Sequence, residues 1–316
     1  LAGRRYRPRI VDTRLEFLLQ ASGAVIIEGP RGCGKTMTSL HHCASYAFID
    51  DPATNQIAQL APQAVLEGPR PRLLDEWQTA PDLFNLVRRE VDAVAEPGQF
   101  ILAGSAVPAD DITRHTGAGR FLRLRQRTLT LFEKAEYSPT VSLTGLFEAQ
   151  QLQPDTNQVS YEQVINDLLI PGFPGYQAGN EHIVLTQLRG YLSEAARSDM
   201  QRVADLRITP LATERLIAAI ARSTAGEVAV STLRKDLDSV SPGISLPTVN
   251  KLLDSLQRIF VVETVPAWAP RLRSKARLRV SPKYHLADPG LAIAALGATS
   301  ASLTADPETT GFVFES

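Results

Sequence analysis

Short apolar runs and helical periodicities alternate along the first part of the chain. The apolar runs are bounded by polar or turn-forming residues and are too short for buried helices, so they predict strands. Strands are expected over residues 24–28, 46–51, 72–77 and 99–105. Helices are expected over residues 15–19, 54–66 and 81–95. Their expected core positions are Ile57, Leu60, Val65 and Leu66 in the second helix and Leu83, Val87, Val91 and Val94 in the third.

The pattern changes in the second half of the chain. Residues 138–160 are polar and loop-like and mark a boundary near residues 140–155. Helices are expected around residues 161–170 and 183–198, on either side of a rigid turn at 171–175, and then over 211–223, 230–240 and 246–259. Short helices followed by a β-ribbon are typical of a winged helix, which we place at 201–268. Asp288 is expected to cap a further helix.

The helix expected at 246–259 has a buried stripe and a polar face. The stripe consists of Val249, Leu252, Leu253, Leu256 and Phe260, and Ser245 is placed to cap the helix. The polar face consists of Thr248, Asn250, Lys251, Ser255 and Arg258. Such a helix can enter the major groove of DNA. Many winged helices instead bind protein or only pack, so both interpretations stay open.

A glycine-rich loop after the first strand carries a specific motif. Residues 29–36 read G-P-R-G-C-G-K-T, which matches the G-x-x-x-x-G-K-[ST] spacing of a phosphate-binding loop. Backbone N–H groups of such a loop surround phosphate oxygens, and the following helix N-terminus favours negative charge. Lys35 is expected to reach the β- and γ-phosphates, and the Thr36 hydroxyl to bind Mg²⁺. A structural glycine-rich turn is the alternative. The predicted nucleotide-binding residues are Gly29, Pro30, Arg31, Gly32, Cys33, Gly34, Lys35, Thr36 and Met37.

Two adjacent carboxylates lie near the end of the strand at 72–77. Side chains at the end of a parallel strand face the crevice that the phosphate loop also occupies. Asp75 is therefore expected to hold Mg²⁺, and Glu76 to orient and polarise the attacking water. Ser105 ends the next strand and is expected beside the γ-phosphate as a sensor. A structural serine that caps the following turn is the alternative.

Residues 111–127 are unusually rich in arginine. Residues 121–127 alternate as a strand, which places Arg123, Arg125 and Arg127 on one face. A row of buried cations is costly without partners, so these side chains are expected at an edge, a neighbouring subunit or a ligand. Arg120 is the first candidate for an arginine that stabilises charge at the γ-phosphate of an adjacent subunit, and Arg114 is the second.

Two other basic clusters have competing interpretations. Arg4, Arg5, Arg7 and Arg9 precede Val11 and are interpreted as a solvated leader, with an inter-subunit or nucleic-acid contact as the alternative. Arg271, Arg273, Lys275, Arg277 and Arg279 recur at every second residue, and Lys283 follows. If this stretch is extended, all five cations project from one face, which suits sequence-independent contact with DNA phosphates. A solvated edge strand guarded by charge is the alternative.

Composition limits the class of protein further. The 316 residues have a net charge of −1 and a 44% hydrophobic content, as in a globular protein of two domains or one large domain with an appendage. Cys33 and Cys43 suggest no disulfide framework, so we expect a cytoplasmic protein. No apolar run approaches the ~18–20 residues of a membrane span, and no membrane partner is expected. The five histidines lack ligand spacing; His41 and His42 are expected to pack.

The motifs together resemble those of bacterial and archaeal AAA+ ATPases with a C-terminal domain of unknown function. The similar segments are Tyr6-Arg7-Pro8-Arg9, GPRGCGKT (29–36), LLDEW (73–77), ILAGSA (101–106), GAGR (117–120), 172–175 and 281–284. The resemblance implies an α/β fold with a five-stranded parallel sheet and helices on both faces, with ATP and Mg²⁺ as ligands. It also implies a homo-oligomer with active sites that bridge subunits, for which we expect a hexamer. Thr128 departs from the proline usual in relatives.

These observations lead to one expected organisation and function. The expected parts are an ATPase domain (1–140), a helical linker or lid (141–200), a winged helix (201–268) and a basic ribbon (269–316). The resemblance implies that the last part also holds the leading edge of a nuclease-like α/β domain. We expect an oligomeric AAA+ ATPase that hydrolyses ATP to drive DNA binding, translocation or remodelling, without nuclease activity. The alternative is a protein remodeller or nucleotide switch whose winged helix does not bind DNA. A non-hydrolysing binding protein is disfavoured, because Asp75 and Glu76 are both present.

Overall fold

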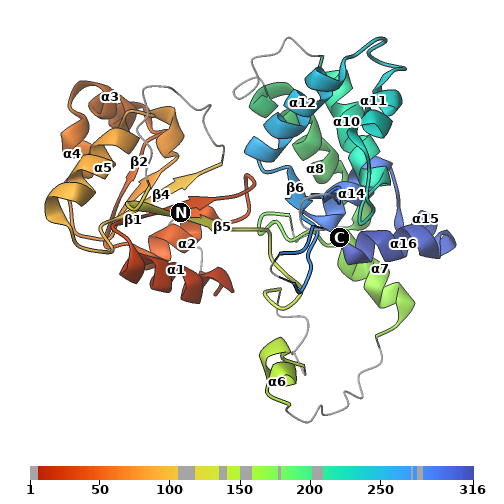
Figure 1. The fold of residues 1–316 in the computed structure, drawn as a ribbon, viewed down its shortest axis with the longest axis horizontal. Helices are drawn as coiled ribbons and strands as arrows, with labels where there is room; N and C mark the ends of the chain where they lie inside the picture. The colour runs from red at the N-terminus through yellow and green to blue at the C-terminus, as the bar shows by residue number, and fades with distance from the viewer. Residues whose placement is uncertain are drawn as a thin grey trace. The chain divides into compact units, whose positions relative to one another are not determined.

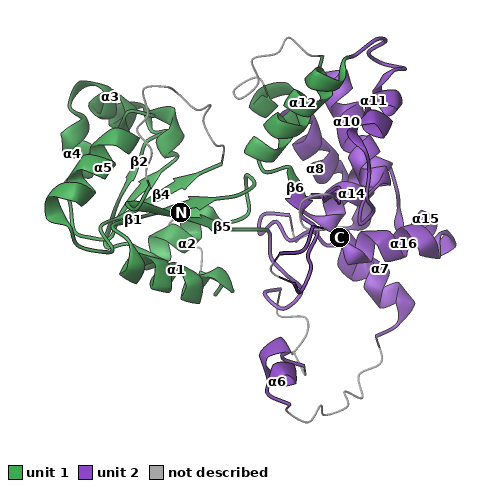
Figure 2. Cartoon of the chain, viewed as in Figure 1, with its two compact units in different colours: residues 1–127, 195–209, 245–263 green, residues 128–194, 210–244, 264–316 purple. Residues whose placement is uncertain are grey.

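The chain divides by its internal contacts into two compact units (Figure 2). The computed structural model describes residues 6–105, 118–134, 141–149, 159–176, 179–200, 209–271, 273–275 and 280–316. The first unit comprises residues 1–127, 195–209 and 245–263, and the second comprises 128–194, 210–244 and 264–316. This division cuts the chain differently from the four parts expected, because the segments 195–209 and 245–263 both group with the first unit.

A five-stranded parallel sheet forms the centre of the first unit (Figure 1). Its strands are β1 (Ala24–Glu28), β2 (Ser45–Phe48), β3 (Arg72–Asp75), β4 (Phe100–Gly104) and β5 (Phe121–Arg125). Their order is β2-β3-β4-β1-β5, and each pairing is parallel. The carboxyl ends of the strands therefore meet at one edge of the sheet. The α/β fold class and the five-stranded sheet expected from the sequence are confirmed.

Helices cover both faces of this sheet. Successive side chains of a strand point to opposite faces, and apolar side chains on both faces are buried. Ile26 in β1 faces one core, while its neighbours Val25 and Ile27 face the other. The first core includes side chains from α3 (Pro52–Leu60), α4 (Pro62–Leu66) and α5 (Leu83–Val94). The second includes side chains from α1 (Val11–Ala21) and is flanked by Leu40 of α2 (Lys35–His42). A short 3₁₀ helix, η1 (Trp77–Thr79), follows β3.

The helix expected over residues 54–66 is two helices that meet at Ala61. Pro62 is tolerated in the first turn of α4, where its missing N–H has no helical partner to lose, but it cannot continue α3. Ile57, Leu60 and Val94 are exposed, so their prediction as core positions is wrong. Ala58 is the buried residue of α3, and the larger apolar side chains beside it face outward.

The first unit also contains the π-helix η2 (Ala195–Asp199) and α12 (Leu246–Arg258). Ser245 caps α12 as predicted, because its Oγ accepts a hydrogen bond from the Thr248 amide at 3.2 Å. The predicted stripe is buried: Val249, Leu252, Leu253, Leu256 and Phe260. Ser255 is buried too, which corrects its assignment to the polar face; it lies three residues after Leu252, on the same side of the helix. Asn250 and Lys251 are exposed.

The second unit is mainly helical. Its helices are α6 (Leu143–Phe147), α7 (Tyr161–Leu169), α8 (Glu181–Glu194), α10 (Pro210–Arg222), α11 (Val230–Leu237), α14 (Pro289–Leu296), α15 (Ser300–Ala305) and α16 (Pro307–Glu315). Asp288 caps α14 as predicted, accepting from the Gly290 amide at 2.9 Å. Helix α14 packs against α8 and α10. Residues 289–316 therefore form helices that belong to this unit.

A two-stranded sheet joins β6 (Val262–Val265) and β7 (Lys283–Leu286). The basic ribbon expected from Arg271 onward is not a continuous strand: the Ser274 amide donates to the Arg271 carbonyl at 3.0 Å, and β7 begins only at Lys283. Arg277 and Arg279 lie outside the described residues. Within the described ranges, no helix combines the length and apolar character needed to cross a membrane.

Candidate active site

The phosphate-binding loop runs from the end of β1 to the first turn of α2. Gly34 precedes α2 in a left-handed conformation, with φ 102° and ψ 14°, which glycine adopts without steric cost. Gly29 approaches the end of β5 so closely that a Cβ atom there would lie 2.0 Å from the Gln126 carbonyl oxygen. The course of the loop therefore requires glycine at both positions.

Lys35 and Thr36 are the first two residues of α2. The Lys35 side chain contacts the phosphate-binding loop, and the Thr36 side chain contacts the end of β3. The Lys35 Nζ donates to the carbonyl oxygens of Gly29 and Pro30, at 2.9 Å each, and the side chain is buried. The ammonium group is thus held within the loop. The Thr36 Oγ1 donates to the Asp75 Oδ2 at 2.9 Å, which joins the loop to the end of β3.

Other residues of the predicted loop differ in exposure. Arg31 is exposed, and its Nη1 lies 3.3 Å from the Asp199 Oδ1 of η2. Cys33 is fully buried, and its Sγ contacts the Gln126 carbonyl oxygen at 3.4 Å. Met37 is half-buried in α2. The loop is therefore packed on one side against the segment after β5.

Asp75 ends β3 and is only 5% exposed. Burial is the main cause that raises its pKa, to about 6; the Glu76 and Asp50 carboxylates raise it further, and the Thr36 hydrogen bond opposes them. A buried carboxylate beside a hydroxyl offers the oxygen ligands that Mg²⁺ prefers, and a divalent cation would offset the repulsion among the carboxylates. Thr36 and Asp75 therefore fit a bound Mg²⁺.

Glu76 follows β3 in a left-handed conformation, with φ 52° and ψ 38°, which is uncommon for a residue with a side chain. Its Oε2 accepts hydrogen bonds from the Gln78 Nε2 and from the Ser105 Oγ, the latter at 3.3 Å. Ser105 directly follows β4, so the structure brings together the predicted water-orienting and sensor residues. Gln78 was missed from the sequence; its place two residues after Glu76 is the signal that could have found it.

Arg120 lies at the other end of the sheet. Its carbonyl oxygen accepts from the Ala24 amide at 3.1 Å, where β1 begins, whereas the phosphate loop follows the end of β1. Its Nε contacts the Asp92 Oδ1 of α5 at 2.7 Å. Arg120 is therefore not placed against the phosphate loop of its own chain. Arg114, the second candidate, lies outside the described residues.

The arginines of β5 are paired within the chain. The sheet order places β5 at an edge, which confirms one of the locations expected for them. Arg123 contacts Glu28 at 2.7 Å. Arg125 and Arg127 both contact Glu263, at 3.5 and 2.8 Å, and the guanidinium of Arg125 also lies over the Phe260 ring. These acids supply the partners that a row of cations requires.

Arg9 corrects the prediction of a solvated leader. Its side chain is buried, and Nη1 donates to the Cys33 carbonyl oxygen at 2.8 Å, while Nη2 donates to the Arg127 carbonyl oxygen at 2.9 Å. The first contact is within the phosphate loop, and the second is just beyond β5. Arg4 and Arg5 lie outside the described residues.

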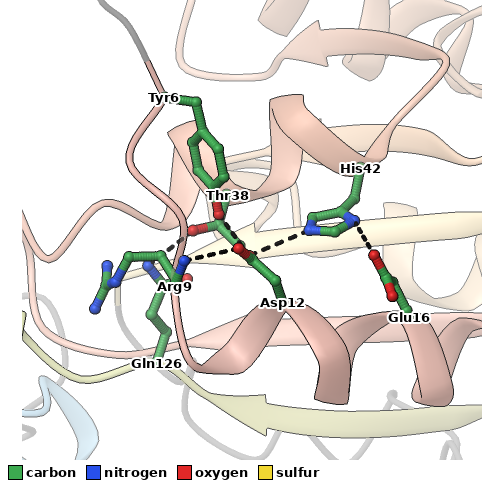
Figure 3. Close-up of polar contacts among 7 residues, drawn as sticks. All are labelled: Tyr6, Arg9, Asp12, Glu16, Thr38, His42 and Gln126. Atoms are coloured by element: carbon green, nitrogen blue, oxygen red, sulfur yellow. Dashed lines mark hydrogen bonds and ion pairs between the residues drawn. The ribbon is translucent and has the colours of Figure 1, made fainter. Parts of the chain in front are cut away.

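Asp12 lies in the first turn of α1 and links the segment around Arg9 to His42 of α2 (Figure 3). Its Oδ2 accepts from the Arg9 amide at 2.7 Å, and its Oδ1 contacts the Tyr6 hydroxyl and, at 3.2 Å, the His42 Nε2. Burial would raise the pKa of Asp12, but these hydrogen bonds outweigh it and lower the pKa. Burial, together with the bond to Asp12, raises the pKa of Tyr6. Tyr6 also stacks on His41, with ring centroids 4.1 Å apart.

Two family models match separate parts of the chain. Residues 21–134 match an AAA domain (AAA_14), the segment that contains the sheet and the phosphate loop. Residues 161–302 match a domain of unknown function, DUF8612. The first match supports an AAA-type P-loop ATPase domain, in agreement with the geometry of the loop and of β3.

One solved structure has a similar fold, and two curated proteins are similar in sequence. The Walker-type ATPase PABY2304 of Pyrococcus abyssi has a TM-score of 0.55 and 15% sequence identity, and the likeness covers 92% of this chain and 96% of that one. Uncharacterized proteins of Mycobacterium tuberculosis and Mycobacterium bovis are each 25% identical over 295 residues, or 92% of this chain. The chain spans 59% of the length of these curated relatives.

Proposed function

We propose that the chain hydrolyses ATP at the carboxyl edge of the five-stranded sheet. The observation that carries this proposal is the meeting of three segments there: Thr36 contacts Asp75 at 2.9 Å, and Glu76 contacts Ser105 at 3.3 Å. The match of residues 21–134 to an AAA domain supports ATPase activity. The decisive test is the substitution of Glu76, with which the Discussion begins.

Each residue of this site has a separable role in the proposed hydrolysis. The loop N–H groups and the Lys35 ammonium would bind the phosphates. Thr36 and Asp75 would hold Mg²⁺, which would supply positive charge to neutralise the phosphates. Gln78 and Ser105 both donate to the Oε2 of Glu76. The other carboxylate oxygen, Oε1, is then the one that accepts a proton from the attacking water. Ser105 thereby links the end of β4 to the orientation of that base.

We propose further that Arg120 completes the site of a neighbouring subunit in a homo-oligomer, expected to be a hexamer. Arg120 lies where β1 begins, whereas the phosphate loop follows the end of β1. This position supports the proposal, because the Arg120 side chain is not placed against the loop of its own chain. A guanidinium supplied from another subunit stabilises the charge that develops on the transferred phosphoryl group.

Mixing two inactive variants tests the role of Arg120. Arg120→Ala and Lys35→Ala are each expected to lower the ATPase rate about 10³-fold or more, because each removes a cation from the phosphates. An equal mixture should recover part of the rate, since some interfaces combine an intact loop with an intact Arg120. Arg89→Ala, an exposed cation of α5, is the control. Failure of the mixture to recover, or full activity of Arg120→Ala alone, contradicts the proposal.

We propose DNA as the substrate on which the ATPase acts. The order α10, α11, α12, β6, β7 is typical of a winged helix and supports this. So do the exposed side chains of Asn250 and Lys251 on α12. Arg271, Arg273 and Lys275 are exposed as well, and they follow β6 in the chain. Cations of this kind bind DNA phosphates without reading sequence.

DNA is expected to stimulate the ATPase, and the stimulation should fade as salt is raised, because phosphate contacts release counterions. The triple substitution of Arg271, Arg273 and Lys275 by alanine should weaken DNA binding and flatten its salt dependence. Alanine at the exposed Arg14 and Arg89 is the control. ATPase rates measured over duplex, single-stranded and junction DNA decide the matter, and rates equal to the DNA-free rate rule out the proposal.

A protein remodeller or nucleotide switch is the second candidate, and one observation favours it. Arg123, Arg125, Arg127 and Lys283 are each paired with a carboxylate of the same chain, so they are engaged rather than free for phosphates. An ATPase that ignores DNA but is stimulated by a protein it binds would identify this candidate. The hydrolytic site is the same in both cases.

A further inference from the structure

Two side chains behind the phosphate loop hold the same carbonyl oxygen. The Cys33 carbonyl oxygen accepts a hydrogen bond from the Arg9 Nη1 at 2.8 Å and another from the Gln126 Nε2 at 3.4 Å. Both donors are buried, and neither belongs to the motif of the loop. Arg9 precedes α1 and Gln126 follows β5, so two distant segments converge on one peptide group of the loop.

The orientation of that carbonyl fixes the direction of an N–H group. The peptide between Cys33 and Gly34 is planar and trans, so its C=O and N–H point in opposite directions. With the Cys33 oxygen held by Arg9 and Gln126, the Gly34 N–H points away from both. In a phosphate loop the backbone N–H groups are the ligands of the phosphate oxygens. Arg9 and Gln126 therefore control a phosphate ligand without touching the phosphate.

The charge of Arg9 adds to this effect. A guanidinium group carries a positive charge that is spread over a planar set of N–H donors. Placed on the carbonyl side, it polarises the peptide and strengthens its N–H as a donor, since hydrogen bonds in series reinforce one another in a buried setting. Asp12 holds the backbone of Arg9, and Tyr6 and His42 contact Asp12 (Figure 3). The guanidinium itself is held by the Cys33 and Arg127 carbonyl oxygens.

Gln126 has a chemistry that packing alone would not select. It is fully buried, and among the described residues its Oε1 accepts no hydrogen bond. A leucine of similar volume would avoid that cost. Its Nε2 instead contacts the Cys33 carbonyl oxygen and, at 3.1 Å, the Thr38 Oγ1 in α2. The amide thus ties the loop to the helix that follows it.

We propose that Arg9 and Gln126 are positioning residues of the phosphate site, which together hold the Cys33 carbonyl so that the Gly34 N–H is aimed at a phosphate group. This inference rests on the proposed nucleotide site, but it concerns binding of the phosphate chain and not the hydrolytic step. It assigns a function to Arg9, the second of the two arginines in the segment Tyr6-Arg7-Pro8-Arg9.

Binding of a ligand without a base isolates this role. The affinity for inorganic tripolyphosphate and for ATP is measured by calorimetry, with circular dichroism to show that each variant is folded. Arg9→Met should weaken both ligands about 10- to 100-fold, because it removes a charge-assisted hydrogen bond from the loop. Arg9→Lys keeps the positive charge but loses the paired N–H donors of the guanidinium, so its affinity for both ligands should lie between those of Arg9→Met and the unchanged chain. Arg14→Met, an exposed arginine on α1, is the control and should bind normally.

Gln126→Leu separates positioning from stability. It should keep or raise the melting temperature and still weaken tripolyphosphate. Guanidinium ions at millimolar concentration should partly restore binding to Arg9→Ala but not to Lys35→Ala. Normal affinity in folded Arg9→Met or Gln126→Leu overturns the inference. A chain that binds tripolyphosphate but does not hydrolyse ATP overturns the proposed function alone, and one that binds neither ligand overturns both.

Discussion

Glu76→Gln is expected to bind ATP as tightly as the unchanged chain and to hydrolyse it about 10²- to 10⁴-fold more slowly, the range lost with a general base. Gln78 and Ser105 donate to only one oxygen of Glu76, so a glutamine can accept both bonds through its carbonyl oxygen. Its NH₂ group then occupies the place of the other oxygen, where it cannot accept a proton. The site keeps its shape and loses its base.

The measurements are calorimetric affinity for ATP and phosphate release in a single turnover. Ser105→Ala is the matched variant, because it removes one of the two donors to the Glu76 carboxylate and leaves the base in place. The hydrolysis rate of Ser105→Ala should fall by a smaller factor than the hydrolysis rate of Glu76→Gln. Turnover retained in Glu76→Gln would remove Glu76 from the mechanism, and lost ATP binding would show that its charge serves the nucleotide rather than the water.

Asp75→Asn is expected to stabilise the ligand-free protein while it abolishes hydrolysis. In the folded chain the pKa of Asp75 is raised to about 6, first by burial and then by the Glu76 and Asp50 carboxylates, from an ordinary value of 3.8. Between about pH 4 and 6 the folded state therefore binds more protons than the unfolded state, so the free energy of unfolding falls as pH rises through this window. Two pKa units correspond to about 3 kcal/mol.

The asparagine removes this penalty, and its Oδ1 can still accept the Thr36 hydroxyl. Melting temperatures recorded at about pH 5 and about pH 8 should differ less in Asp75→Asn than in the unchanged chain. At about pH 8 the variant should melt at a higher temperature than the unchanged chain. Hydrolysis should be lost, because a neutral amide is a poor ligand for Mg²⁺. Asp82→Asn, at an exposed carboxylate, is the control. If Asp75→Asn melted at a lower temperature than the unchanged chain at about pH 8, the ionised Asp75 carboxylate would not destabilise the folded state, and the prediction would be wrong.

Features whose residues are adjacent in the chain could be predicted from the sequence. The strand, loop and helix around Lys35 form one contiguous motif, and Asp75 and Glu76 directly follow the apolar pair Leu73-Leu74. Ser245 caps α12 through a residue three positions away. In each case the physical signal, a spacing or a periodicity, lies within a few residues, so the pattern alone carries it.

Contacts between distant segments were not predictable in this way. Arg9 reads as part of a charged leader, because its carbonyl partners lie 24 and 118 residues further along the chain. Glu263, which pairs with Arg125 and Arg127, is separated from Arg127 by 136 residues. Local pattern also misled at Ile57 and Leu60, where the small Ala58 turned out to be the residue that faces the core. Burial there depends on what covers the helix, which the periodicity does not contain.

The close approach of Gly29 to Gln126 has a consequence for how such motifs are interpreted. Glycine at this position is required by the backbone of Gln126, directly after β5, whether or not a nucleotide ever binds. A descendant of this chain that had lost its substrate could discard Lys35 or Glu76 and still need Gly29 to fold. The first glycine of the motif is thus required by the fold, whereas Lys35 and Glu76 are required only by the proposed hydrolysis.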